Sequence, residues 1–291
     1  MNILYFTYAL SGLAILTMAI GTGVLITRKF HLEWGIYWIG AATFIISQVG
    51  HIPFNYGMLL LIQHGFLPIP PAEWQLPVKA VALGLSAGLF EECARYLVLR
   101  WWAKDARSWA TGLLFGAGHG GMEAIFIGAL ILYIYIQLVA VQGIDLSTVV
   151  TQDKLALAQQ QVSAYWSSTW YDSLLSAVER LFALPVQIGL AVMVMQAFTR
   201  GQIRWLGLAI AWHAAVDAVA VYAIPTWGIY ITEGLVGVMS LVSLAIIFLL
   251  YKPEPVPTPE PVTVPLISGE LLASISGLSE TSENLDQTRF G

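Results

Sequence analysis

The sequence contains a single cysteine, Cys93, among 291 residues. One thiol excludes an internal disulfide framework and any metal site built from several cysteines. Charged residues are also scarce, at 11% of the chain, whereas 57% of the residues are hydrophobic. Soluble domains hold about 25% charged residues, so the composition predicts a multi-pass protein of the cell membrane. The net charge of -5 says little about partners; we expect membrane lipid and no nucleic acid.

Long apolar runs predict an all-α, polytopic transmembrane bundle. Seven of them reach about 20 residues, which is enough to cross a bilayer as a helix. They are Ile3–Thr27, Ile36–Ile62, Pro77–Trp101, Trp109–Val141, Tyr171–Phe198, Leu206–Ile224 and Ile229–Tyr251. The first is longer than the core of a signal peptide, so we interpret it as a retained helix. The fourth is too long for one span and should bend near its glycines or project from the membrane.

Basic residues predict the orientation of these helices. If the chain crosses seven times, one side receives Arg28, Lys29, Arg100, Lys104, Arg107, Arg200, Arg204 and Lys252. The loops on the other side hold only Lys79 and Lys154. By the positive-inside rule, the N-terminus lies outside and the C-terminus is cytoplasmic.

Two segments differ in composition from the apolar runs. Residues 142–170 form a polar, glutamine-rich outer loop that could hold a short surface helix. After Lys252, a Pro-rich spacer leads into a stretch rich in serine and glutamate, which we interpret as a disordered cytoplasmic tail. The sequence therefore predicts a transmembrane domain at 1–252 and a tail at 253–291.

Ionisable residues in the middle of the third run suggest a function. Glu91, Glu92 and Arg95 lie within the stretch Leu83–Trp102, where ionised groups are costly unless they face a protein interior or a wet cavity. At about 100° per residue, Arg95 projects between the two carboxylates and can reach either. It could neutralise one and leave the other to exchange a proton. The alternative is a buried ion pair that only locks this helix to its neighbours.

The fourth run contains a histidine and an acid one turn apart. His119 and Glu123 share a helix face within the sequence F-G-A-G-H-G-G-M-E. Gly116 and Gly120 are small residues four positions apart, which lets a neighbouring helix approach closely. A lone membrane histidine is more often a packing group, but the glycines and the nearby acid favour a functional one.

Other runs repeat the one-turn spacing of polar residues. The sixth contains His213 and Asp217, and the second contains His51 and Asn55. The fifth contains Glu179, Arg180 and Gln187. Counting from the cytoplasmic ends at about 1.5 Å per residue places four residues at a similar depth: Glu91, Glu92, His119 and His213. We therefore expect separate helices to bring these acids and imidazoles together.

Such a set can hydrolyse an amide. A carboxylate and a neutral histidine that flank one water can activate it as a nucleophile, with the carboxylate as general base. A second histidine can donate a hydrogen bond to the oxyanion that forms.

Three motifs resemble those of the YhfC-type intramembrane proteases. They are E-E-C-A-R on the third run, G-H-G-G-M-E on the fourth and H-A-A-V-D on the sixth. That family is in turn similar to the CAAX-protease and bacteriocin-processing superfamily. The resemblance covers about His51 to Tyr222 and implies a bundle of seven or eight helices. It implies a glutamic-type endopeptidase that acts on a membrane-associated protein or peptide.

The resemblance also implies roles for individual residues. Glu91 would be the general base with Glu92 as its neighbour, although the spacing to the following arginine leaves either glutamate open as the base. His119 would help to activate water, and His213 would donate to the oxyanion. Asp217 would orient or charge His213, because an ionised aspartate cannot donate a hydrogen bond. The supporting residues would be Arg95, Glu123, Asp217 and Glu179.

Three alternatives stay open. A zinc-dependent protease could use His119, His213 and Glu91 as ligands, although the chain has no H-E-x-x-H motif and Gln187 stands where the family resemblance leads us to expect histidine. A proton-coupled transporter would also use buried acids and histidines, but the polar motifs differ between the two halves. A catalytically silent scaffold would keep them as packing. We expect no cofactor, with zinc as the alternative.

Overall fold

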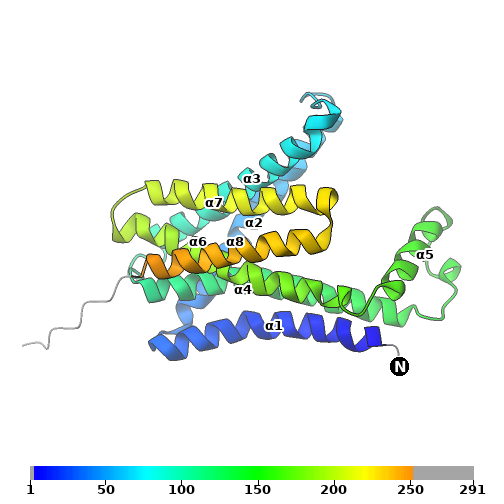
Figure 1. Cartoon of the computed structure of the whole chain (residues 1–291), viewed down its shortest axis with the longest axis horizontal. Coiled ribbons are helices and arrows are strands. Elements are labelled where there is room, and N and C mark those ends of the chain that lie inside the picture. Colours follow the sequence, from blue (N-terminus) through cyan, green and yellow to red (C-terminus); the bar gives the residue numbers. More distant parts are fainter. Residues whose placement is uncertain (1–2, 252–291) are drawn as a thin grey trace, which may run out of the picture. The chain divides into compact units, whose positions relative to one another are not determined.

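The computed structural model describes residues 3–251, and this part of the chain is helical with no strand. Its α-helices are α1 (Ile3–Phe30), α2 (Trp34–Gln63), α3 (Ala72–Trp101), α4 (Trp109–Ala140), α5 (Gln152–Ser167), α6 (Leu175–Thr199), α7 (Arg204–Trp227) and α8 (Ile229–Leu249). The 3-10 helices η1 (Leu146–Thr148) and η2 (Asp172–Leu174) precede and follow α5. Each predicted apolar run corresponds to one long helix, so the all-α bundle is confirmed (Figure 1). The predicted tail at 253–291 lies outside the described residues.

The remaining helix, α5, lies in the polar segment where a short surface helix is predicted. None of its residues is buried. Its last turn contacts the first turns of α1: the rings of Tyr8 and Tyr165 stack with centroids 3.9 Å apart, and Tyr8 Oη lies 2.7 Å from Ser168 Oγ. These contacts place α5 beside the N-terminal end of α1, as Figure 1 shows.

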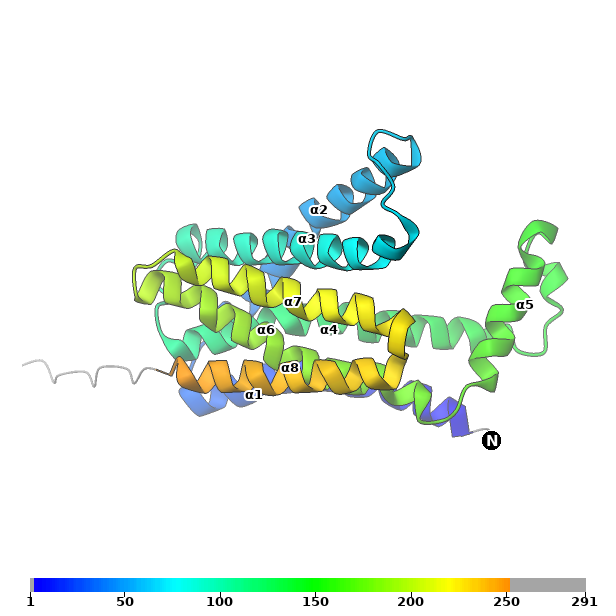
Figure 2. The same cartoon turned by 45° about the horizontal axis from the view of Figure 1, so that its top comes forward.

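In the described part of the chain, six helices are long and apolar enough to cross a membrane, namely α1, α2, α4, α6 together with η2, α7 and α8. The helix α3 is as long as α2, with 30 residues, but the charged residues in its middle make it less apolar. It packs against α2, α6 and α7, and Figure 2 shows it beside α7. Gly88 permits this approach, because a Cβ there would lie 2.7 Å from the carbonyl oxygen of Ile210. The face of α3 that carries Glu91, Glu92 and Arg95 is thus buried against its neighbours.

Contacts at the helix ends show which loops lie together. Trp109 at the start of α4 packs against Phe30 at the end of α1 and against Tyr251, with ring centroids 5.7 Å and 4.9 Å away. Just before α4, the guanidinium of Arg107 lies 4.4 Å from the ring centroid of Phe198 near the end of α6. The basic residues between Arg28 and Arg204 that predict the orientation therefore lie at this end of the bundle. That this end faces the cytoplasm stays a prediction.

The helix α4 lies between α1, α2 and α6. Its 32 residues span about 48 Å at 1.5 Å per residue, more than the roughly 30 Å of a hydrocarbon core, and Figure 2 shows it continuing towards α5. Its glycines allow the close approach predicted for them. A Cβ on Gly116 would lie 2.7 Å from Ile188 Cα, and one on Gly120 would lie 2.7 Å from Gln187 Cβ. Within residues 3–251, most of the apolar side chains that are 0% exposed lie on α4 and α6: Leu114, Phe115, Ala117, Ala124, Leu190, Ala191, Val194 and Met195.

Candidate active site

Three helices bring the predicted acids and imidazoles together inside the bundle. Glu91 and Glu92 lie on α3, His119 lies on α4 and His213 lies on α7. Glu92 and His119 are 0% exposed and His213 is 3% exposed, whereas Glu91 retains 7%. Of the two glutamates, Glu91 is therefore the one with some access for a reactant.

Glu92 is the carboxylate that the arginine neutralises. Arg95 Nη1 donates to both of its oxygens, at 2.7 Å and 3.0 Å. His213 Nδ1 lies 2.7 Å from Glu92 Oε1. Three short contacts from two helices hold this carboxylate, so it is poorly placed to accept a further proton. The sequence predicts that Arg95 can reach either glutamate, and the structure shows the shorter contact with Glu92.

Glu91 faces the histidines instead. Its Oε2 lies 3.1 Å from His119 Nε2 and 4.0 Å from His213 Nε2. Arg95 Nη2 is 3.8 Å from the same oxygen. The other oxygen, Oε1, accepts a hydrogen bond of 3.1 Å from Gln48 Nε2 on α2. One carboxylate oxygen thus points at two imidazole nitrogens from two other helices.

These contacts assign the protons of the neutral imidazoles. His119 must carry its proton on Nε2 to donate to Glu91, which leaves Nδ1 as an acceptor; this atom is buried without a hydrogen-bond partner in the described part of the chain. His213 must carry its proton on Nδ1 to donate to Glu92. Its Nε2 then presents a lone pair near Glu91 Oε2. A neutral His213 is therefore an acceptor at this position, and only its imidazolium can donate to an oxyanion.

Asp217 lies at the edge of this group. Its Oδ2 is 3.6 Å from His213 Nε2, and its side chain is 39% exposed. It is close enough to stabilise a charge on the imidazole. However, Glu92 is the nearer partner of His213, so it and not Asp217 fixes the orientation of the ring.

The remaining predicted supporting residues, Glu123 and Glu179, contact Arg180 in a separate group of three residues, which we call the Arg180 cluster. Arg180 Nη1 lies 2.7 Å from Glu123 Oε1, and Arg180 Nε donates to Glu179 Oε2 at 3.0 Å. The one-turn spacing suggests Glu123 as the partner acid of His119, but the hydrogen-bonded acid is Glu91, whose side chain reaches His119 from α3. Glu179 contacts Arg180 and neither member of the glutamate pair.

Gln187 on α6 connects the Arg180 cluster with the glutamate–histidine cluster, by which we mean Glu91, Glu92, Arg95, His119 and His213. Its Oε1 accepts a hydrogen bond from Arg95 Nη2. Its Nε2 donates to Glu123 Oε2 at 2.8 Å. A neutral amide suits this position, since it accepts from the arginine and donates to the carboxylate at the same time.

Sequence reasoning did not identify Gln48 as part of the site. It identified the pair His51 and Asn55 on the same helix, which are indeed hydrogen-bonded, with Asn55 Nδ2 2.9 Å from His51 Nε2. His51 also lies 3.2 Å from Ser86 Oγ, away from the glutamates. The signal for Gln48 was its position one turn before His51, which extends a polar stripe along α2.

The imidazoles and the free carboxylate of the glutamate–histidine cluster are also candidate ligands of a zinc ion. Catalytic zinc commonly takes two histidines and a glutamate, which is the chemical set offered by His119, His213 and Glu91. The contact from Glu92 to His213 Nδ1 is of the kind that orients a metal-binding imidazole. In residues 3–251, no three His, Cys, Asp or Glu side chains are already arranged around one metal position. The donor set therefore fits zinc in its chemical type.

Comparisons with known proteins agree with these motifs. The model of a family described as YhfC intramembrane metalloprotease matches residues 14–240. The chain is 33% identical over 218 residues to the membrane protein YhfC of Bacillus subtilis strain 168, which is described as uncharacterized. That alignment covers 73% of this chain and 82% of the relative. No solved structure matches the chain.

Proposed function

Since the chain belongs to the family of YhfC intramembrane metalloproteases, we propose that it is an endopeptidase that cleaves a membrane-associated protein or peptide with Glu91 as general base. Membership of this family favours a peptidase over a proton-coupled carrier or a silent scaffold. The assignment of the base and of the other roles is our proposal.

The choice of Glu91 as the general base rests on one observation. Glu91 Oε2 lies 3.1 Å from His119 Nε2 and 4.0 Å from His213 Nε2, so a reactant bound near this oxygen would meet groups from α3, α4 and α7. Glu92 is committed to Arg95 and His213, which supports Glu91 as the base.

In the proposed reaction, Glu91 Oε2 takes a proton from a water molecule whose oxygen attacks the carbonyl carbon of the scissile peptide bond. His119 holds Glu91 in place through its Nε2–H. The imidazolium of His213 donates from Nε2 to the oxyanion while its Nδ1–H stays on Glu92. The proton on Glu91 then passes to the amide nitrogen as the C–N bond breaks, which gives a carboxylate and an amine. General acid–base catalysis of this kind contributes about 10²- to 10⁴-fold.

Glu92 and Arg95 set up His213 in this scheme. The carboxylate of Glu92 keeps the ring turned so that Nε2 faces Glu91, and Arg95 neutralises the charge that Glu92 brings into the bundle. If the protein holds zinc, its ligands would be His119, His213 and Glu91, with Glu92 orienting His213 from behind. A zinc ion there would supply Lewis-acid polarisation of the peptide carbonyl.

Purified protein in liposomes with a pool of synthetic single-span transmembrane peptides tests the proposal, with mass spectrometry reading new peptide termini. We expect the wild type to cleave at least one peptide. Glu91→Gln should abolish cleavage, and Glu92→Gln should lower it about 10- to 100-fold through His213. Full activity in both variants would reject a glutamate-dependent peptidase.

The metal content of the protein distinguishes a metal-dependent protease from a glutamic one. Elemental analysis of the purified protein should be compared with that of His213→Gln, together with cleavage in a strong chelator. A bound zinc that is lost in the variant would establish the metal-dependent form. A metal-free protein that keeps its activity in chelator would establish the glutamic form.

The orientation is also proposed. The basic residues at the end of the bundle that holds Trp109 and Tyr251 favour a cytoplasmic position for that end by the positive-inside rule, with the N-terminus outside. In intact cells, a protease added outside should cleave an epitope placed before α1. An epitope that stays fully protected would show that the orientation is the opposite one.

A further inference from the structure

We infer that Gln48 is a positioning residue for the general base and that α2 fixes the positions of Glu91 and His119 relative to each other. The helix α2 carries none of the predicted catalytic side chains. The inference rests on the proposed function of Glu91. Its basis is a pair of contacts made by one face of α2.

The first contact fixes the carboxylate. Gln48 Nε2 donates to Glu91 Oε1 at 3.1 Å, whereas His119 Nε2 contacts Oε2 at 3.1 Å. The terminal torsion of a glutamate is broad, so a single donor would leave the carboxylate free to turn. Donors on separate oxygens, from α2 and α4, make the two oxygens inequivalent. Gln48 holds Oε1, and Oε2 is thereby directed towards the histidines.

The second contact fixes the histidine. Phe44 lies one turn before Gln48, and its ring packs edge-on against the His119 imidazole with centroids 5.4 Å apart. An edge-to-face contact restrains the orientation of the ring. The same stripe of α2 therefore touches both members of the Glu91–His119 pair.

The position of this stripe is fixed by the preceding turns of α2. A Cβ on Gly40 would lie 2.1 Å from the carbonyl oxygen of Phe115, and one on Gly118 would lie 1.9 Å from that of Tyr37. The backbones of α2 and α4 are therefore in direct contact just before Phe44. Tyr37 is fully buried and donates from its hydroxyl to the Ala19 carbonyl at 3.1 Å. Such packing leaves α2 little freedom to rotate.

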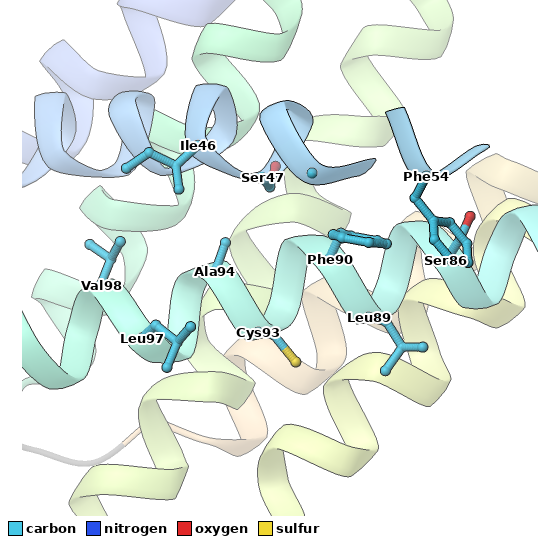
Figure 3. A pocket seen from close by; sticks show the side chains of 11 residues that line it. Ile46, Ser47, Phe54, Ser86, Leu89, Phe90, Cys93, Ala94, Leu97 and Val98 are labelled. Atoms are coloured by element: carbon cyan, nitrogen blue, oxygen red, sulfur yellow. The ribbon is translucent and has the colours of Figure 1, made fainter. Parts of the chain in front are cut away.

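An apolar pocket of about 540 Å³ lies between α2 and α3 (Figure 3). Ser47 and Cys93 are among its lining residues. Ser47 Oγ lies 3.3 Å from Gln48 Nε2 and donates to the Phe44 carbonyl at 2.7 Å. Ser47→Ala therefore removes the other side-chain partner of the same amide and leaves the Glu91 contact in place. Cys93 is the single thiol of the chain, so its labelling rate reports whether α2 still packs on α3.

The test compares Gln48→Met, which keeps the length of the side chain without its N–H groups, with Ser47→Ala. For the peptide cleaved fastest in the transmembrane pool, Gln48→Met should lower kcat about 10- to 100-fold and change KM less than twofold, because Gln48 touches the base and not the substrate. Ser47→Ala should stay within twofold of the wild type in kcat. Cys93 should react with a maleimide at the wild-type rate in both variants.

An infrared measurement tests the contact without turnover. The difference spectrum between wild type and Glu91→Gln isolates the carboxylate bands of Glu91, and Gln48→Met should shift them whereas Ser47→Ala should not. Unshifted bands would overturn the inference, as would a wild-type kcat in Gln48→Met, an equal loss in Ser47→Ala, or altered labelling of Cys93. If Glu91→Gln itself cleaves normally, the proposed function fails, and the infrared result still decides whether Gln48 holds the carboxylate.

Discussion

The glutamate–histidine cluster and the Arg180 cluster each combine one arginine with two glutamates, but they distribute the charges differently. Arg180 contacts both of its carboxylates, Glu123 and Glu179, and both of these are partly exposed, at 21% and 34%. Arg95 is fully buried and makes its short contacts with Glu92. The second carboxylate of the buried cluster, Glu91, is left to two imidazoles.

This difference separates a structural ion-pair group from a site that can react. A carboxylate held by an arginine is a fixed counter-ion, whereas one that faces an imidazole can exchange a proton with it or with a water between them. We therefore propose that the glutamate–histidine cluster carries out the chemistry and that the Arg180 cluster joins α4 to α6.

The largest expected difference is between His119 and Glu123, which lie one turn apart on α4. His119→Gln removes the imidazole beside Glu91 and should lower kcat by about 10²- to 10⁴-fold. Glu123→Gln keeps an amide near Gln187 and should cost less than about tenfold, because it touches no proposed reacting group. Cleavage rates in liposomes check both. Equal losses in the two variants would remove the distinction between the clusters.

The next difference is in stability and compares the two arginines. Arg95→Met leaves Glu92 buried with one charged partner removed, so it should lower the free energy of unfolding by about 3–5 kcal/mol. Arg180→Met should cost about 1–3 kcal/mol, since water can reach Glu123 and Glu179. Reversible unfolding in mixed micelles measures both values. A larger loss for Arg180→Met would contradict the account.

The smallest effect is expected at Gln187, which joins the clusters. Gln187→Met removes one hydrogen bond from Arg95 and one from Glu123, but each keeps another charged partner. The free energy of unfolding should fall by about 1 kcal/mol, and kcat should fall less than tenfold. A loss as large as that of His119→Gln would show that the clusters act as one unit, and the same two measurements would reveal it.

The arrangement of helices was predictable because hydrophobic length reports it directly. Each apolar run became one helix, and the polar segment that follows the fourth run became α5. The charges of α3, which make it the least typical span, were also what led us to place the proposed site on it. Equal depth on separate helices predicted that Glu91, His119 and His213 would meet.

The pairing within the site was less predictable, because it depends on how the helices rotate about their axes. Positions along one helix place Arg95 between Glu91 and Glu92. In the structure, Arg95 makes its short contacts with Glu92, which also contacts His213 of α7. One-turn spacing likewise suggested Glu123 as the partner of His119, whereas the structure places Glu91 of α3 beside it. Gln48 was missed because its partner lies on another helix, and its place one turn before His51 does not show which residue it contacts.

The most direct test of the central claim is an electron cryomicroscopy map of the protein in lipid nanodiscs that resolves side chains and bound solvent. The account predicts density for one water or one ion within hydrogen-bonding or ligand distance of Glu91 Oε2, His119 Nε2 and His213 Nε2. A map in which these three side chains point to different neighbours, with no shared density between them, would contradict it.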